Sequence, residues 1–267
     1  MSVVHVRGIE LAYEASGAGL PVVLLHGFPF NRTLWREQVE ALRERYTVVT
    51  VDLRGHGETH ATHDDSPATM EVMAEDVAAL LDELRLARVV LGGLSMGGYV
   101  ALAFYRLFPE RVRALVLADT RPQADTDEAR LGREETAARA LSQGMQSIAD
   151  AMLPKLFAPA TQTERPEIVA RVRDMILQTD PRGAAAALHG MALRADQREL
   201  LREIDCPVLV VVGRLDAVTP LADSASMSRE IPGARLEVIE EAGHVSNLER
   251  PAGFNRALVD FLDALEP

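Results

Sequence analysis

The chain of 267 residues has a single cysteine, Cys206, and only 4% of its residues are aromatic. One cysteine excludes an intrachain disulfide and any zinc site built from several thiolates. Cys206 begins the apolar run 206–212, so we expect a buried structural thiol rather than a nucleophile. Because aromatic side chains are scarce, valine, leucine, alanine and methionine have to fill the core of the protein.

Long hydrophobic runs and an excess of positive charge are also missing. No run approaches the length of about 18 apolar residues that a membrane-spanning helix needs, and residues 1–7 lack the apolar segment of a signal peptide. The formal net charge of −12 argues against nucleic acid or an anionic membrane surface as a partner. We therefore expect a cytoplasmic protein, and its oligomeric state stays open.

Two common kinds of cofactor site are missing as well. The glycine-rich segment 52–57 lacks the Gly-x-x-x-x-Gly-Lys pattern of a phosphate-binding loop, and we interpret it as a structural turn with a buried His56. No cluster of His, Asp and Glu has the spacing of metal ligands. We expect neither a cofactor nor a metal ion.

Apolar runs alternate with helical patterns over most of the chain. Residues 3–6 and 9–13 predict an antiparallel hairpin at the edge of a sheet. Further apolar runs predict six strands, at 21–25, 46–51, 89–94, 112–118, 207–213 and 234–239. Helical patterns separate or follow them, at 34–42, 70–84, 221–230 and 252–265. This alternation predicts an α/β fold, with a mostly parallel sheet covered on both faces by helices.

The alternation stops between residues 121 and 202, where no strand-like run occurs. We interpret 121–202 as an insertion of a few short helices, broken at Pro154, Pro159, Pro166 and Pro181, in a core made of residues 1–120 and 203–267. Methionine adapts to apolar cavities of irregular shape. We expect four apolar side chains of the insertion and of the segment after residue 244 to line a substrate pocket: Met145, Met152, Phe157 and Val245.

A Gly-x-Ser-x-Gly motif, centred on Ser95, lies between the predicted strand 89–94 and a helix-like segment. A tight strand-to-helix turn brings the neighbours of its central residue close together, so that Gly93 and Gly97 avoid clashes of Cβ atoms. The hydroxyl of Ser95 would then lie at a helix N-terminus, where an anion is favoured. We predict that Ser95 is a nucleophile.

A serine hydroxyl needs a neighbouring base and a group that orients this base. His244 follows a glycine in the loop after the last predicted strand, and it is the candidate base. Asp216 comes just after a buried strand and is the candidate acid, while Asp119 also ends a strand and competes with it. In parallel sheets, ligands bind at the carboxyl ends of the strands. The histidines without such a context are interpreted as surface or packing residues: His5, His60, His63 and His189.

The tetrahedral intermediate of acyl transfer carries an oxyanion that needs two hydrogen-bond donors. We predict that the backbone N–H groups of Met96, directly after the nucleophile, and of Phe28 form this oxyanion hole. His26 is expected to brace the loop that carries Phe28.

Five segments together resemble the α/β-hydrolase superfamily over essentially the whole chain: 26–29, 52–57, 93–97, 213–216 and 243–244. The resemblance implies an eight-stranded, mostly parallel sheet with a helical cap inserted after the sixth strand, which is where segment 121–202 falls. Haloalkane dehalogenases and epoxide hydrolases of this fold use aspartate as the nucleophile, which does not agree with Ser95.

The resemblance implies a carboxylesterase that forms an acyl-enzyme on a small-molecule ester or lactone. Alternatives with the same triad are a lactonase for acyl-homoserine lactones or enol-lactones, a perhydrolase (also called a cofactor-free haloperoxidase) and a C–C hydrolase. A binding protein without catalysis is the alternative from another class, and the full set of five motifs argues against it.

Overall fold

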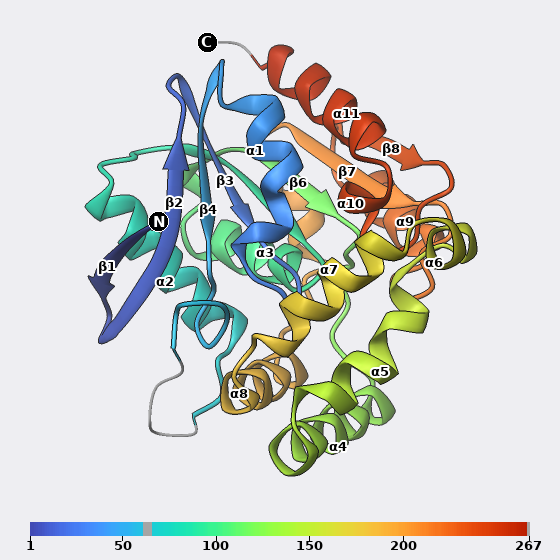
Figure 1. The fold of residues 1–267 in the computed structure, drawn as a ribbon. Helices are drawn as coiled ribbons and strands as arrows, with labels where there is room; N and C mark the ends of the chain where they lie inside the picture. The colour runs from blue at the N-terminus through green and yellow to red at the C-terminus, as the bar shows by residue number, and fades with distance from the viewer. Residues whose placement is uncertain (61–65, 266–267) are drawn as a thin grey trace.

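The structure is a computed structural model that describes residues 1–60 and 66–265, so the interpretation of His63 lies outside the described residues. In this part of the chain eight strands form one sheet, in the order β1-β2-β4-β3-β5-β6-β7-β8 (Figure 1). The strands β1 (Ser2–Val6) and β2 (Ile9–Ser16) form the predicted edge hairpin. The remaining strands are β3 (Leu20–Leu25), β4 (Tyr46–Val51), β5 (Val89–Leu94), β6 (Val112–Ala118), β7 (Val208–Gly213) and β8 (Arg235–Ile239).

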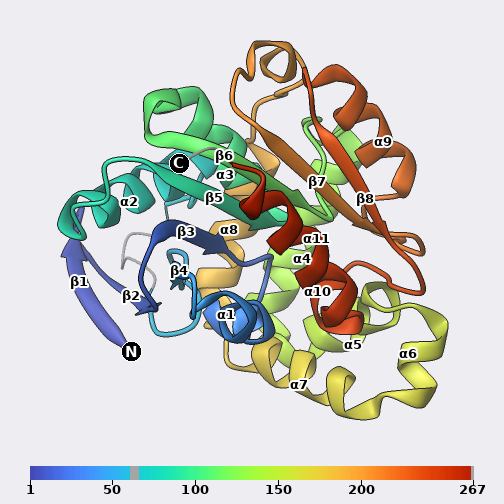
Figure 2. The ribbon, with the colours of Figure 1, turned by 90° about the horizontal axis from the view of Figure 1, so that it is seen from above.

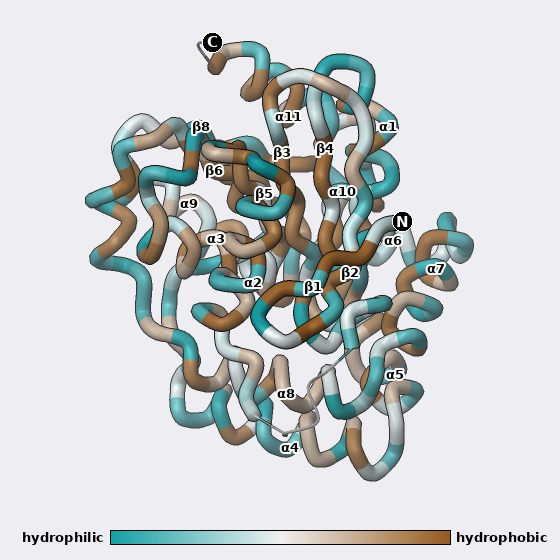
Figure 3. The backbone as a smooth tube through the Cα atoms, turned by 90° about the vertical axis from the view of Figure 1, so that its left-hand side faces the viewer, coloured by the Kyte–Doolittle hydropathy of each residue, from teal (hydrophilic) through white to brown (hydrophobic). Residues whose placement is uncertain are grey.

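The six strands β3 to β8 run parallel to one another, and β2 pairs with β4 in the antiparallel direction. Every residue of β5 and of β7 is buried. The hydropathy colours show the same feature, with hydrophobic stretches along β3, β5 and β6 (Figure 3). Strands that are apolar on both faces are expected where helices cover both sides of a parallel sheet.

Helices cover both faces of the sheet (Figure 2). On one face, α1 (Arg36–Leu42), which continues from the 3-10 turn η1 (Arg32–Trp35), contacts α11 (Pro251–Asp263). On the other face lie α2 (Met70–Glu83), α3 (Met96–Leu107) and α9 (Leu221–Glu230). The remaining short elements are η2 (Pro109–Arg111), η3 (Leu200–Glu203) and α10 (Ser246–Glu249). The α/β-hydrolase fold predicted from the sequence is confirmed.

Five helices lie between β6 and β7, beyond the carboxyl ends of the strands in Figure 1, and we call them the helical insertion. They are α4 (Asp127–Gln143), α5 (Met145–Leu156), α6 (Pro159–Glu164), α7 (Pro166–Leu177) and α8 (Pro181–Ala192). Within the insertion α4 contacts α8, and α5 contacts α7.

The predicted breaks in the insertion are only partly correct. Pro159, Pro166 and Pro181 each occupy the first position of a helix, where the missing N–H group of proline is not needed. Pro154 instead lies inside α5, two residues before that helix ends, so the break expected there was wrong. The helix α4 has 17 residues and is not one of the short helices that we expected.

Candidate active site

Ser95 occupies a turn between β5 and α3 that has room only for glycine two residues before and two residues after the serine. Its backbone has φ of 54° and ψ of −114°, a left-handed conformation that costs energy for any residue with a Cβ atom. A Cβ atom on Gly93 would lie 2.1 Å from the carbonyl oxygen of Gly97, and one on Gly97 would lie 2.2 Å from that of Leu25. These backbone contacts hold the serine at the carboxyl end of β5, in the strained turn expected for a nucleophile.

His244 lies between Ser95 and Asp216 and is hydrogen-bonded to both. Its Nε2 atom is 2.9 Å from the Oγ atom of Ser95, and its Nδ1 atom is 2.8 Å from the Oδ2 atom of Asp216. The imidazole and the carboxylate are buried, whereas Ser95 keeps partial exposure to solvent. The fold therefore brings the three residues of the predicted triad together from separate loops. In this order they can pass a proton from a hydroxyl to a base that a carboxylate orients.

Asp216 is held by a turn that sequence reasoning did not identify. Its Oδ1 atom accepts hydrogen bonds from the amides of Val218 and Thr219, at 2.7 and 2.9 Å, and its Oδ2 atom accepts one from the hydroxyl of Thr219 at 2.6 Å. Burial acts to raise the pKa of Asp216, but His244 and the donors of Thr219 outweigh it and lower the pKa below its usual range. The carboxylate is thus ionised at neutral pH and fixed in place beside His244.

The competing carboxyl group, Asp119, has different partners. Its Oδ1 atom accepts the amide of Gly213 at 2.8 Å, and its Oδ2 atom accepts the hydroxyl of Ser246 at 2.5 Å. Burial, followed by the negative charge of Asp216, raises the pKa of Asp119 well above its usual range. Of the two aspartates, the geometry favours Asp216 as the partner of His244.

The loop that follows β3 passes directly beside the serine. A Cβ atom on Gly27 would lie 3.3 Å from the Cβ atom of Ser95, so this backbone is in contact with the Ser95 turn. Phe28 directly follows Gly27. Met96 is the first residue of α3, and the N–H groups in the first turn of a helix have no acceptor within that helix. Within residues 1–60 and 66–265 neither the Phe28 amide nor the Met96 amide has a hydrogen-bond acceptor. Both donors are therefore free for a ligand, and their role as an oxyanion hole stays a prediction.

His26 supports this loop as a neutral side chain. Its Nδ1 atom donates to the carbonyl of Gly27 at 2.9 Å, and its Nε2 atom accepts the amide of Leu53 at 3.0 Å. Burial lowers the pKa of His26 to about 4. The ring of His56 lies 5.1 Å from that of His26. Burial, followed by the electrostatic repulsion between the two rings when protonated, lowers the pKa of His56 to about 3. Two buried neutral imidazoles thus join the loop to the segment after β4.

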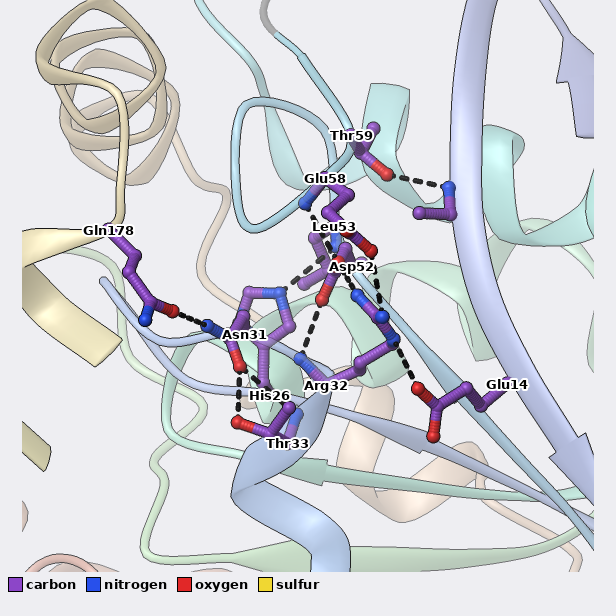
Figure 4. Close-up of polar contacts among 11 residues, drawn as sticks. Glu14, His26, Asn31, Arg32, Thr33, Asp52, Leu53, Glu58, Thr59 and Gln178 are labelled. Atoms are coloured by element: carbon purple, nitrogen blue, oxygen red, sulfur yellow. Dashed lines mark hydrogen bonds and ion pairs between the residues drawn. The ribbon is translucent and has the colours of Figure 1, made fainter. Parts of the chain in front are cut away.

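A charged cluster lies behind the same loop, as Figure 4 shows. Arg32 is buried and pairs with Glu14 at 3.1 Å, with Glu58 at 2.8 Å and with Asp52. Asp52 also accepts the amide of Arg32 at 2.6 Å and that of Glu58 at 2.9 Å. The cluster ties the loop after β3 to the end of β4 and to β2. Asp76 in α2 is also buried and pairs with Arg54 at 2.7 Å, so this acidic residue of the helix does not face solvent.

Three of the four predicted pocket residues lie in α5 or directly after it, and the fourth, Val245, lies in the His244 loop. Phe157 and Val245 are buried, and Val245 directly follows His244 in the chain. Met145 is the first residue of α5 and is buried, whereas Met152, farther along that helix, is partly buried. Their contact with a substrate stays a prediction.

Other kinds of site find little support in the described part of the chain. Among residues 1–60 and 66–265 no group of three or more His, Cys, Asp or Glu side chains could hold a metal ion. Cys206 is buried, and burial raises the pKa of its thiol to about 12, which is the behaviour of a structural thiol. No helix in the described residues is long and apolar enough to span a membrane.

Comparisons with known proteins agree with this fold. Residues 21–251 match the family described as the alpha/beta hydrolase fold. A thermophilic esterase from Thermogutta terrifontis is 43% identical, covers 99% of this chain and 97% of its own, and superimposes with a TM-score of 0.95. The enol-lactonase from Burkholderia xenovorans LB400 is 32% identical over 98% of this chain and 100% of its own, with a TM-score of 0.91. The 3-oxoadipate enol-lactonase 2 of Acinetobacter baylyi is 32% identical over 94% of this chain and 92% of its own.

Proposed function

Since the chain belongs to the alpha/beta hydrolase fold family, we propose that it is a serine hydrolase that cleaves a small-molecule carboxylic ester through an acyl-enzyme. The observation that supports this proposal most directly is the hydrogen-bonded series from Ser95 through His244 to Asp216, with distances of 2.9 and 2.8 Å. The esterase and enol-lactonase relatives support the same class of reaction.

In the proposed reaction Ser95 attacks the carbonyl carbon of the ester while His244 removes its proton. Asp216 stabilises the imidazolium that forms, and the amides of Phe28 and Met96 bind the oxyanion of the tetrahedral intermediate. His244 then gives the proton to the leaving alcohol. In the second half of the reaction His244 activates a water molecule, which releases the acid from Ser95.

A lactone is the second candidate substrate, because two of the relatives are enol-lactonases. A lactone is a cyclic ester, so the chemistry at Ser95 is the same and the alcohol remains part of the product. The helical insertion would act as a cap over the core, residues 121–202 over residues 1–120 and 203–267. In this proposal it supplies aliphatic side chains to the acyl site, with Met145, Met152, Phe157 and Val245 among them.

Steady-state hydrolysis of p-nitrophenyl esters from acetate to decanoate, measured beside a homoserine lactone and an enol-lactone, tests the proposal. A sharp optimum of kcat/KM among the esters supports a carboxylesterase. Weak, flat ester activity beside fast opening of one lactone supports the lactonase. Turnover of neither class, or turnover that persists in the Ser95→Ala variant, would reject the proposal.

A further inference from the structure

The loop that carries His244 is bound to the helical insertion through a buried carboxylate. Glu249, the last residue of α10, is fully buried. Its Oε1 atom accepts the amide of Gly243 at 2.6 Å, and its Oε2 atom accepts the amide of Ala158 at 2.9 Å. One carboxylate therefore binds the residue before His244 and a residue between α5 and α6.

The backbone of the loop also contacts the insertion directly. The amide of His244 donates to the carbonyl of Leu156 at 2.8 Å. A Cβ atom on Gly243 would lie 2.7 Å from the amide nitrogen of Ala158, so the two backbones touch and only glycine fits. Arg165 at the start of α7 adds a third link, because its Nη1 atom donates to the carbonyl of Glu249 at 2.7 Å.

The sheet does not hold His244 in the same way as it holds the two other members of the triad. Ser95 directly follows β5 and Asp216 lies three residues after the end of β7, whereas His244 lies five residues after the end of β8. The position of its ring depends on where the loop backbone lies. A shift of about 1 Å in a reacting group is enough to lower a rate by about 100-fold.

We propose that Glu249 is a positioning residue for His244, and that its carboxylate clamps the His244 loop to the helical insertion by accepting the amides of Gly243 and Ala158. The inference rests on the proposed function of His244 as the base. It makes the insertion a part of the structure that sets the geometry of the triad, in addition to covering the substrate.

Two variants break the clamp from opposite ends. In Glu249→Gln one oxygen becomes an NH₂ group, which faces an amide donor instead of accepting from it. In Ala158→Pro the other donor is lost, and the Cδ atom of the ring takes the place of the N–H and pushes the carboxylate of Glu249 away. The backbone itself suits the change, because φ is −58° at this position and the extended Phe157 suits the residue before a proline. Glu240→Gln is the matched control, because it removes an exposed carboxylate that pairs with Arg214 and binds neither amide.

Each clamp variant is expected to lower kcat for the best ester by about 10- to 100-fold while KM changes by less than about 2-fold. The double variant should lose no more than the larger single loss, since both changes remove the same clamp. Glu240→Gln should retain the activity of the unaltered protein. The proposal that Glu249 positions His244 is wrong if both variants are folded, as judged by circular dichroism, and keep kcat within about 2-fold. It is also wrong if the losses of kcat multiply in the double variant.

A second measurement does not depend on turnover. The proton between His244 Nδ1 and Asp216 should give a downfield ¹H NMR resonance, assigned by its loss in His244→Ala. It should shift or broaden in Glu249→Gln and in Ala158→Pro, and remain unchanged in Glu240→Gln. An unchanged resonance in both clamp variants overturns the inference, even in a protein that hydrolyses esters. If no ester or lactone is turned over at all, the proposed function fails, and the resonance still decides whether Glu249 positions His244.

Discussion

The Ser95 turn and the His244 loop differ in what holds them in place. The Ser95 turn is enclosed by backbone of the central sheet, where Gly97 touches the end of β3. The His244 loop is bound to the helical insertion through the carbonyl of Leu156 and the carboxylate of Glu249. One half of the site is thus built by the sheet and the other half by side chains that connect two regions distant in sequence. Four changes test this comparison, beginning with the largest expected effect.

Asp216→Asn is expected to lower kcat by about 10⁴-fold, because an amide cannot hold the imidazole of His244 in the required tautomer. Asp119→Asn is the control and should change kcat by less than about 10-fold. The oxygens of Asp119 accept hydrogen bonds from the amide of Gly213 and the hydroxyl of Ser246 and none from His244, so this change leaves the partner of the imidazole in place. Equal losses in the two variants, measured as kcat on one ester, would contradict the choice of Asp216.

Gly97→Ala is expected to lower the free energy of unfolding by about 3 kcal/mol, because its new Cβ atom would lie 2.2 Å from the carbonyl oxygen of Leu25. Gly132→Ala, in α4 of the insertion, is the matched change, since a Cβ atom there meets nothing within 4 Å. Alanine favours the helix and should add about 0.5 to 1 kcal/mol. Chemical denaturation measures both values. A Gly97→Ala protein as stable as the unaltered one would show that the turn is not enclosed as described.

The buried histidines on the sheet side should make stability depend on pH. The folded pKa of His26 is about 4 and that of His56 about 3, both below the value of 6.5 in an unfolded chain. As the pH falls below 6.5 the unfolded chain binds protons that the folded protein does not, so stability decreases. Each histidine should contribute a loss of about 2 kcal/mol between pH 7 and pH 5.

Denaturation at these two pH values measures this loss, and His56→Gln should reduce it by about half. A free energy of unfolding that is constant from pH 7 to pH 5 would contradict the assignment of His26 and His56 as neutral.

Thr179→Val tests a contact between the insertion and the loop beside Ser95. The buried hydroxyl of Thr179 donates to the carbonyl of Pro29 at 2.7 Å, one residue after Phe28. Valine keeps the shape and leaves that carbonyl without its donor, which should cost about 1 kcal/mol of stability and lower kcat by less than about 10-fold. Thr179→Ser keeps the hydroxyl and should retain kcat. Equal effects of valine and serine on kcat would assign the role to packing.

The two halves of the site also differ in how far the sequence predicts them. The Ser95 turn has a short local pattern, a strand with glycines at fixed spacing, and the strand bounds 46–51, 89–94 and 112–118 agree with the structure. Glu249 has no such pattern, because its partner Ala158 lies 91 residues away in the sequence. Which side chain reaches which amide is decided by the packing of the insertion on the core. The pair of Asp76 with Arg54, 22 residues apart in the sequence, likewise depends on packing, here within the core. The support of Asp216 by Thr219 is local, because the two residues are three positions apart, and an aspartate followed by a threonine at this spacing is a turn pattern that could have indicated it.

The role of Ser95 as the nucleophile can be tested by finding which residue a fluorophosphonate modifies, because this reagent forms a stable adduct only with an activated nucleophile. We expect one adduct per chain, located on Ser95 by peptide mass mapping, with loss of ester turnover in proportion to labelling. The Ser95→Ala variant should remain unlabelled, and His244→Ala should label far more slowly. A protein that turns over esters while Ser95 stays unmodified, or that carries the adduct on another residue, would show that Ser95 is not the nucleophile.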